Sequence, residues 1–187
     1  MNFKGTLSHV DAVDLFSAQW NAEKPGIDVE ALEAWGRLKR TANLFEKALS
    51  QVLEEYDLNM AEFEVLAALV RTGAPYETRP TELTRSLIIT PGAVTARLTT
   101  LERRGFIARR PHHEDRRVQL VALSAKGLRA FEPALEGLLL RCEAILDELP
   151  KADRSDLHSS LRALLMVLDG ERVTDGDAVS DAAVANA

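Results

Sequence analysis

The chain is poor in cysteine, in aromatic residues and in long apolar runs. The shortage of cysteine and that of long apolar runs each exclude a class of protein. Only one of its 187 residues is cysteine, so a disulfide framework within the chain is excluded and a reducing compartment is expected. No apolar run reaches the roughly 18 residues that suggest a membrane span. The N-terminus lacks the apolar segment of a secretory signal. We therefore expect a cytoplasmic protein.

Patterns that support catalysis or metal binding are also absent. The sequence has no Ser/His/Asp or Cys/His constellation, no glycine-rich phosphate loop and no ligand cluster at metal spacing. We expect neither an enzyme nor a bound cofactor or metal. Cys142 lies on the apolar stripe of a predicted helix, where a buried small hydrophobe is the first interpretation and a redox sensor the alternative. His112 and His113 are interpreted as surface residues, with DNA contact as the alternative.

What the chain does contain is 46% hydrophobic residues, rich in alanine and leucine, which favours helices around a real core. The net charge of −6 is unevenly distributed. Residues 97–118 carry seven arginines against three acids, and the rest of the chain is strongly acidic. Because duplex phosphates respond to the local surface, this basic segment is compatible with binding nucleic acid.

Apolar residues at three- and four-residue spacing predict helices at 7–21, 28–56 and 59–71. Asn59 and Glu62 resemble a capping box at the start of the third helix. The second helix has apolar residues that alternate by three and four positions: Trp35, Leu38, Ala42, Phe45, Leu49, Val52 and Tyr56. This heptad seam favours packing against long partner helices, and an intramolecular core is the alternative.

The segment 80–123 has the order helix, turn, helix, hairpin. A short helix at 81–87 precedes a helix that is capped by Thr90 and stops at Gly105. In the second helix Val94, Leu98 and Leu101 form the expected buried stripe, and the small residues Thr95, Ala96 and Thr99, with Arg97, lie off it. Small side chains on an exposed helix face permit close approach to base edges.

Two β-rich runs, 106–110 and 117–123, then predict a hairpin whose tip ends in Asp115, Arg116 and Arg117. A helix able to enter a groove, followed by an arginine-tipped hairpin, is typical of proteins that read duplex DNA. Helices after Ser124 and after Pro150 complete the predicted elements, and residues 170–187 are expected to be a disordered tail.

The run LERRGFIARRPHHEDRR at 101–117, followed by LSAKG at 123–127, closely resembles the MarR family of winged helix-turn-helix regulators. The resemblance covers about residues 28–168. It implies a mainly α fold with a small β-hairpin wing, in which the winged helix-turn-helix is embedded in an all-helical dimerisation frame. It also implies a homodimer that binds a pseudo-palindrome in double-stranded DNA, most often as a repressor released by a small, often aromatic, ligand.

The resemblance carries functional roles to particular residues. Arg117 matches the wing arginine that enters the minor groove, and Asp115 matches the acid that orients it. Arg103, Arg104 and Arg110 are expected to contact phosphates, while Thr95 and Arg97 contribute base readout. The expected DNA-binding residues are Thr90, Pro91, Gly92, Thr95, Arg97, Arg103, Arg104, Arg110, Asp115, Arg116 and Arg117.

A narrower resemblance concerns a urate-responsive branch of the family. That branch has an additional N-terminal helix with a tryptophan, an acid on the second core helix, and arginines on the recognition helix and at the start of the wing. These places hold Trp20, Glu64, Arg97 and Arg109, with Glu in place of the branch's Asp. The expected effector is a purine-like or phenolic compound.

Each of these ligand assignments has a plainer alternative. Trp20 can simply pack its helix onto the frame, Glu64 can be a solvated helix residue, and Arg97 and Arg109 can be phosphate contacts. A winged-helix module that binds protein instead of DNA is the rival function. The predicted domains are 1–57 for dimerisation and a possible ligand pocket, 58–123 for DNA binding, 124–169 for dimerisation and 170–187 for the tail.

Overall fold

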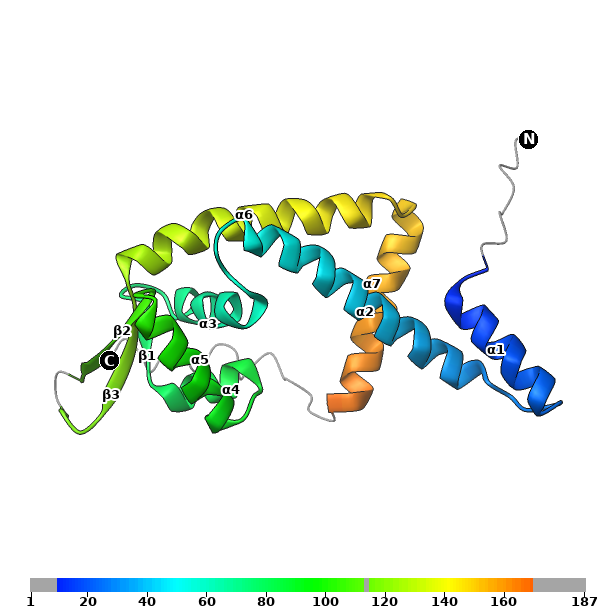
Figure 1. The fold of residues 1–187 in the computed structure, drawn as a ribbon, viewed down its shortest axis with the longest axis horizontal. Helices are drawn as coiled ribbons and strands as arrows, with labels where there is room; N and C mark the ends of the chain where they lie inside the picture. The colour runs from blue at the N-terminus through cyan, green and yellow to red at the C-terminus, as the bar shows by residue number, and fades with distance from the viewer. Residues whose placement is uncertain (1–9, 113–114, 170–187) are drawn as a thin grey trace. The chain divides into compact units, whose positions relative to one another are not determined.

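The computed structural model describes residues 10–112 and 115–169. The elements along the chain are α1 (Ala12–Glu23), α2 (Glu30–Glu54), α3 (Met60–Arg71), β1 (Glu77–Thr78), α4 (Pro80–Leu87), α5 (Pro91–Arg103), β2 (Ile107–Pro111), β3 (Gln119–Leu123), α6 (Ala125–Asp147) and α7 (Lys151–Asp169) (Figure 1). The predicted mainly helical fold with a small β wing is confirmed. The expected disordered tail, 170–187, lies outside the described residues.

The chain divides into two compact units, residues 1–141 and 142–187. In the first unit, α1 packs on the N-terminal part of α2, where the buried Val13 faces Gly36 so closely that a Cβ added there would lie 3.5 Å from its methyl groups. Arg37 of α2 binds the N-terminus of α1. The Arg37 guanidinium pairs with Asp14 and, at 2.9 Å, with Asp11. Asp11 is itself the N-cap of α1, so one ion-pair cluster both starts this helix and docks it.

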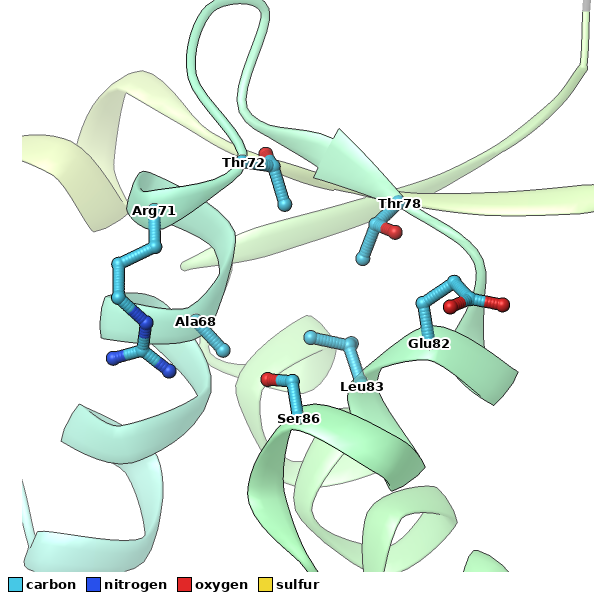
Figure 2. A pocket seen from close by; sticks show the side chains of 7 residues that line it. All are labelled: Ala68, Arg71, Thr72, Thr78, Glu82, Leu83 and Ser86. Atoms are coloured by element: carbon cyan, nitrogen blue, oxygen red, sulfur yellow. The ribbon is translucent and has the colours of Figure 1, made fainter. Parts of the chain in front are cut away.

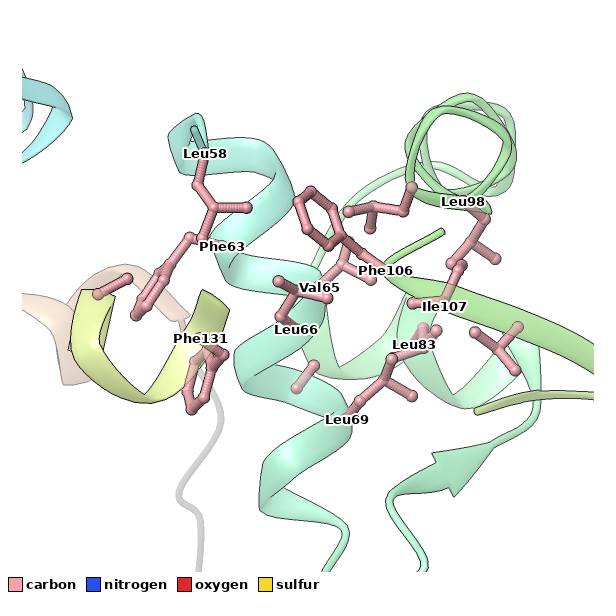
Figure 3. Packing of buried hydrophobic residues seen from close by; sticks show 14 of the residues in the cluster. Leu58, Phe63, Val65, Leu66, Leu69, Leu83, Leu98, Phe106, Ile107 and Phe131 are labelled. Carbon is pink, nitrogen blue, oxygen red and sulfur yellow. The ribbon is translucent and has the colours of Figure 1, made fainter. Parts of the chain in front are cut away.

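The hydrophobic core of the first unit is built around α3. Figure 3 shows the side chains of α3 between α6 on one side and the helix-turn-helix with the root of the wing on the other. Phe63 of α3 stacks on Phe131 of α6, with ring centroids 5.2 Å apart. On the opposite side Leu66 and Leu69 belong to the same buried cluster as Leu98 of α5. The predicted capping box of Asn59 and Glu62 starts α3, as expected.

The sheet has three antiparallel strands in the order β1-β3-β2. The hairpin of β2 and β3 was predicted within one or two residues at each strand end. Strand β1 was not predicted from the sequence. Its two residues pair with Val121 and Ala122 of β3, which joins the wing to the chain before α4.

Hydrogen bonds of Ser124 join the start of α6 to the turn that follows α5. The Ser124 hydroxyl donates to the carbonyl of Gly105 at 2.7 Å and accepts from the N–H of Gly127 at 3.0 Å. A Cβ added at Gly127 would lie 2.2 Å from the Phe106 carbonyl oxygen, so only glycine fits. The glycine of the LSAKG motif therefore permits close packing between α6 and the root of the wing.

The second unit contains the end of α6 and all of α7. Arg154 of α7 pairs with Asp147 at 2.7 Å, and Leu146, Leu157 and Leu161 line a hollow of about 520 Å³ between the two helices. No residue of α7 is buried. Its large exposed apolar side chains are Leu157, Leu161, Leu164, Leu165, Met166, Val167 and Leu168.

The predicted seam of α2 divides into two parts. Leu49, Val52 and Tyr56 pack against the core of the first unit, as the intramolecular alternative requires. Trp35 and Leu38, nearer the N-terminus, are exposed. Within the described residues, no helix is long and apolar enough to cross a membrane.

Candidate functional site

Helix α5 presents one apolar side to the core and one small, polar side to solvent. Val94, Leu98 and Leu101 are buried, as their spacing predicted. The exposed residues on the other side are Pro91, Gly92, Thr95, Ala96, Thr99 and Arg103, together with Glu102. A helix fixed on one side, with small residues on the other, is able to lie in the major groove of DNA.

The start of α5 is well defined. The Thr90 hydroxyl accepts from the N–H of Ala93 at 3.3 Å, and Pro91 occupies the first helical position, where its missing N–H costs nothing. Ile88 ends α4 in the left-handed conformation, with φ of 53°, and is exposed. The predicted cap and the predicted first turn are confirmed, and they fix where the exposed side of α5 begins.

Arg97 turns away from the exposed side of α5 and toward α3. Its Nη1 lies 2.7 Å from Oε2 of Glu64, and the arginine side chain is only 24% exposed. Two of the four residues expected at the ligand site are thus in contact. This bond engages only Nη1 and directs the guanidinium toward α3, and the expected role of Arg97 in base readout stays a prediction.

Arg103 and Arg104 are neighbours in sequence with different surroundings. Arg103 is exposed, and within the described residues no carboxylate pairs with it. Arg104 is mostly buried: its guanidinium lies 2.5 Å from Glu62 and 2.7 Å from Asp57, and it stacks over the Phe106 ring at 4.7 Å.

Glu62 is 3% exposed, so Arg104 balances a buried charge. Burial of the guanidinium opposes its charge, but the ion pairs with Glu62 and Asp57 outweigh burial and raise the pKa of Arg104. The sequence pattern did not identify this pair. Its only signal was the capping box, which already placed Glu62 at the start of α3.

The wing carries its arginines at two levels. At the base, Arg109 of β2 pairs with Glu102 of α5 at 3.2 Å, and Arg110 pairs with Glu77 of β1. At the tip, Asp115, Arg116 and Arg117 are exposed. The tip arginines are therefore placed to reach a ligand outside the chain, while those at the base hold the wing.

Asp115 is bonded to the backbone at the tip of the wing. Its carboxylate accepts the backbone N–H of Arg117 at 2.9 Å, which stabilises the turn, and within the described residues it makes no ion pair with the Arg117 guanidinium. The expected role of Asp115 in orienting Arg117 stays a prediction. His113 and Glu114 lie outside the described residues.

Trp20 lies on α1 and is 36% exposed. Its ring meets that of Phe16 edge to face, with centroids 6.1 Å apart. Within the described residues of this chain, no interaction joins Trp20 to Glu64, Arg97 or Arg109. The structure thus brings Glu64 and Arg97 together, places Arg109 against Glu102, and leaves Trp20 with its neighbour on α1.

A pocket that the sequence did not predict lies between α3, β1 and α4 and measures about 210 Å³ (Figure 2). Ala68 and Leu83 are among its apolar lining residues, and Thr72, Thr78 and Ser86 contribute hydroxyl groups. None of the four residues expected to bind ligand lines it. Such a pocket between helices could not be seen in a linear sequence.

Comparison with known proteins agrees with this geometry. The MarR family profile matches residues 58–118, from the turn before α3 to the tip of the wing. The chain is 35% identical over 147 residues to the HTH-type transcriptional regulator PecS of Dickeya dadantii, which covers 79% of this chain and 86% of PecS.

Solved structures show the same fold. One is a cysteine-to-serine mutant of MarR from E. coli complexed with operator DNA, with a TM-score of 0.62, 24% identity, and coverage of 78% of this chain and 97% of MarR. Another is the organohalide-sensing regulator RdhR bound to 2,4-dichlorophenol, with a TM-score of 0.65, 22% identity, and coverage of 74% and 80%.

Proposed function

We propose that this chain, which belongs to the MarR family of DNA-binding transcriptional regulators, is a homodimeric repressor released from a pseudo-palindromic operator by a small ligand. It is a transcription regulator and not an enzyme. The observation that carries the proposal is the pairing of a capped, exposed α5 with a hairpin whose tip presents Arg116 and Arg117.

In this proposal α5 of each protomer enters a major groove, with the two half-sites about one helical turn apart. Arg117 enters the adjacent minor groove, where a narrow groove concentrates negative potential and suits a planar guanidinium. Arg103 and Arg116 contact phosphates. Arg104 and Arg110 remain candidate phosphate contacts, although both already pair with carboxylates of the chain.

The dimer is proposed to form through the exposed apolar residues of α7 and the N-terminal half of α2. Seven large apolar side chains of α7 and the side chains of Trp35 and Leu38 are exposed in the single chain. Monomeric proteins rarely leave an apolar surface of this extent uncovered. A second copy would cover these surfaces and would hold the two α5 helices at a fixed spacing.

Release is proposed to act through the pair of Glu64 and Arg97. This pair joins α3 to the recognition helix at 2.7 Å, so an anionic ligand that attracts Arg97 would shift α5. Trp20 and Arg109 are the further proposed contacts, and a purine-like or phenolic compound has the planar, acidic character that they suit. The chlorophenol bound to RdhR supports the phenolic class.

The test of the DNA proposal is fluorescence anisotropy of the full chain on duplex DNA from upstream of its own gene, with excess random competitor. Binding should survive the competitor, and Arg117→Ala should weaken it by at least tenfold while the Arg162→Ala control has no effect. Equal affinity of Arg117→Ala and the parent would remove the wing from the proposal. Increased expression from the operator when the gene is deleted would establish repression.

The effector is tested by titrating urate and several phenolic acids into the preformed complex. One of them should release the DNA from the parent protein, whereas Trp20→Ala and Glu64→Gln should require higher concentrations. If both variants respond as the parent does, the proposed ligand site is wrong even though the DNA proposal stands.

A further inference from the structure

The exposed side of α5 carries only small side chains over most of its length. Gly92, Thr95, Ala96 and Thr99 follow one another at helical spacing, and all four are exposed. The first long exposed side chain with hydrogen-bond donors on this side is Arg103, in the last turn. Asn, Gln and Arg make the bidentate bonds that identify adenine and guanine in the major groove, and the other turns present none of them.

The two threonine hydroxyls are already engaged with the helix. The Thr95 hydroxyl donates to the Pro91 carbonyl at 2.9 Å, and the Thr99 hydroxyl donates to the Thr95 carbonyl at 2.9 Å. A threonine hydroxyl has a single proton, so neither residue retains a donor for a base edge. What these side chains still present to a base is a hydroxyl oxygen, which can only accept, and a methyl group.

Arg97 does not supply the hydrogen-bond donor that the exposed side of α5 lacks. Its guanidinium is held by Glu64 of α3 at 2.7 Å, and only 24% of its side chain is exposed. This charge-assisted bond, which is stronger than a neutral one, directs the guanidinium toward α3 and away from the exposed side of α5.

Gly92 bears on how closely an external partner can approach the exposed side of α5. Among residues 10–112 and 115–169, a Cβ added at Gly92 meets no atom within 4 Å, and the backbone does not require glycine. Glycine in a helix is less stable than alanine, so nothing in the described part of the chain accounts for it. Close approach of an external partner to the helix backbone is one of the few roles that glycine fills and alanine does not.

From these contacts we infer that α5 identifies thymines by their C5-methyl groups, through the methyl groups of Thr95, Ala96 and Thr99. The inference rests on the proposed entry of α5 into the major groove. Thymine is the base that presents a methyl group there, and threonine or alanine methyls are apolar partners for it. Guanine recognition would then be confined to Arg103 at the end of the helix.

The test uses the operator selected by the full-length chain from a random duplex library, and then replaces single thymines with deoxyuridine. This change removes only the C5-methyl group. Affinity should fall about three- to fivefold at one to three thymines in each half-site, the loss expected for one buried methyl. Deoxyuridine between the half-sites is the control and should have no effect.

A matched pair of protein variants separates the methyl from the hydroxyl. Thr95→Val keeps the methyl and removes the hydroxyl, so it should bind the operator as the parent does. Thr95→Ser keeps the hydroxyl and removes the methyl from both protomers, so it should lose about ten- to 25-fold on the two half-sites together. This loss should disappear on the operator that carries deoxyuridine at the contacted position of both half-sites.

Two results would overturn the inference. If deoxyuridine has no effect at any position while 7-deazapurines weaken binding, the helix reads hydrogen-bonding edges. If Thr95→Val loses affinity and Thr95→Ser does not, the hydroxyl is the reader. Selection that yields no preferred sequence would overturn the proposed operator itself, and is recognised by equal binding to operator and random DNA.

Discussion

At Gly92 the requirements of folding and of DNA binding act in opposite directions. Among the described residues the added Cβ of Gly92→Ala meets nothing within 4 Å, so the substitution should stabilise the chain. The gain should be smaller than the roughly 1 kcal/mol of a helix interior, because Gly92 lies in the first turn of α5. The same methyl would stand between α5 and the groove, so operator affinity should fall. Thermal unfolding and anisotropy on one preparation measure both effects. A variant that is more stable and binds equally well would show that the DNA does not approach here.

Arg103 and Arg104 provide a second contrast between single residues. Arg103→Met should leave stability unchanged and lower the slope of log K against log salt by about 1.8, the effect of one lost phosphate contact in each half-site. Arg104→Met should leave the slope unchanged and cost about 2–3 kcal/mol of stability, because Glu62 would remain buried without its partner.

Glu62→Gln is the control that completes this comparison, because Glu62 is buried and cannot contact DNA. It should reproduce the stability loss of Arg104→Met in direction and leave the salt slope unchanged. Should Arg104→Met lower the slope as much as Arg103→Met, the phosphate role expected for Arg104 from the sequence would be correct after all.

Among the elements, α1 depends most on a single cluster. Asp11, Asp14 and Glu33 all pair with Arg37, and only Val13 and Ser17 of α1 are buried. Arg37→Met should therefore release α1 from α2 and increase amide hydrogen exchange at residues 12–23 without changing that of α3 or α5. The exposed Arg40→Met is the matched control. Unchanged exchange in α1 would mean that apolar packing alone holds this helix.

The same cluster predicts a pH dependence. The hydrogen bond from Arg37 holds the pKa of Asp11 below its ordinary value of 3.8, with help from the backbone N–H groups of Asp14 and Val13. A lowered carboxyl pKa contributes stability above its ordinary value, and this contribution is lost as the pH falls through the lowered one. Protection of α1 should thus be constant near neutral pH and decrease below about pH 4. Arg37→Met should weaken this dependence, because only the backbone N–H groups would then lower the pKa of Asp11.

The elements were predictable where their signals are local. Thr90 with Pro91, Asn59 with Glu62, and the spacing of Val94, Leu98 and Leu101 each define a feature within a few residues. Strand β1 was missed because its two residues become a strand only by pairing with residues more than forty positions later in the chain. The different surroundings of Arg103 and Arg104 were missed because they follow from the helix direction, which rotates about 100° per residue.

At the scale of the whole molecule, the exposed apolar side of α7 predicts an obligatory second copy. Leu161→Asp should convert the dimer to monomers in light scattering and weaken operator binding, since a single half-site offers about half of the contacts. Asp156→Lys, which has none of the exposed apolar residues of α7 at three or four positions from it, should leave the dimer intact. If Leu161→Asp remains dimeric at low concentration, another surface forms the interface.

The separation of buried from exposed residues on α5 affects how such regulators diverge. Its buried residues and its exposed residues form two sets that do not overlap, so substitutions at Gly92, Thr95, Ala96 and Thr99 change the outer surface without disturbing Val94, Leu98 or Leu101. After gene duplication, one copy could acquire a new target site by one or two substitutions at little cost in folding. Selection could then act on target preference and on stability as nearly independent traits.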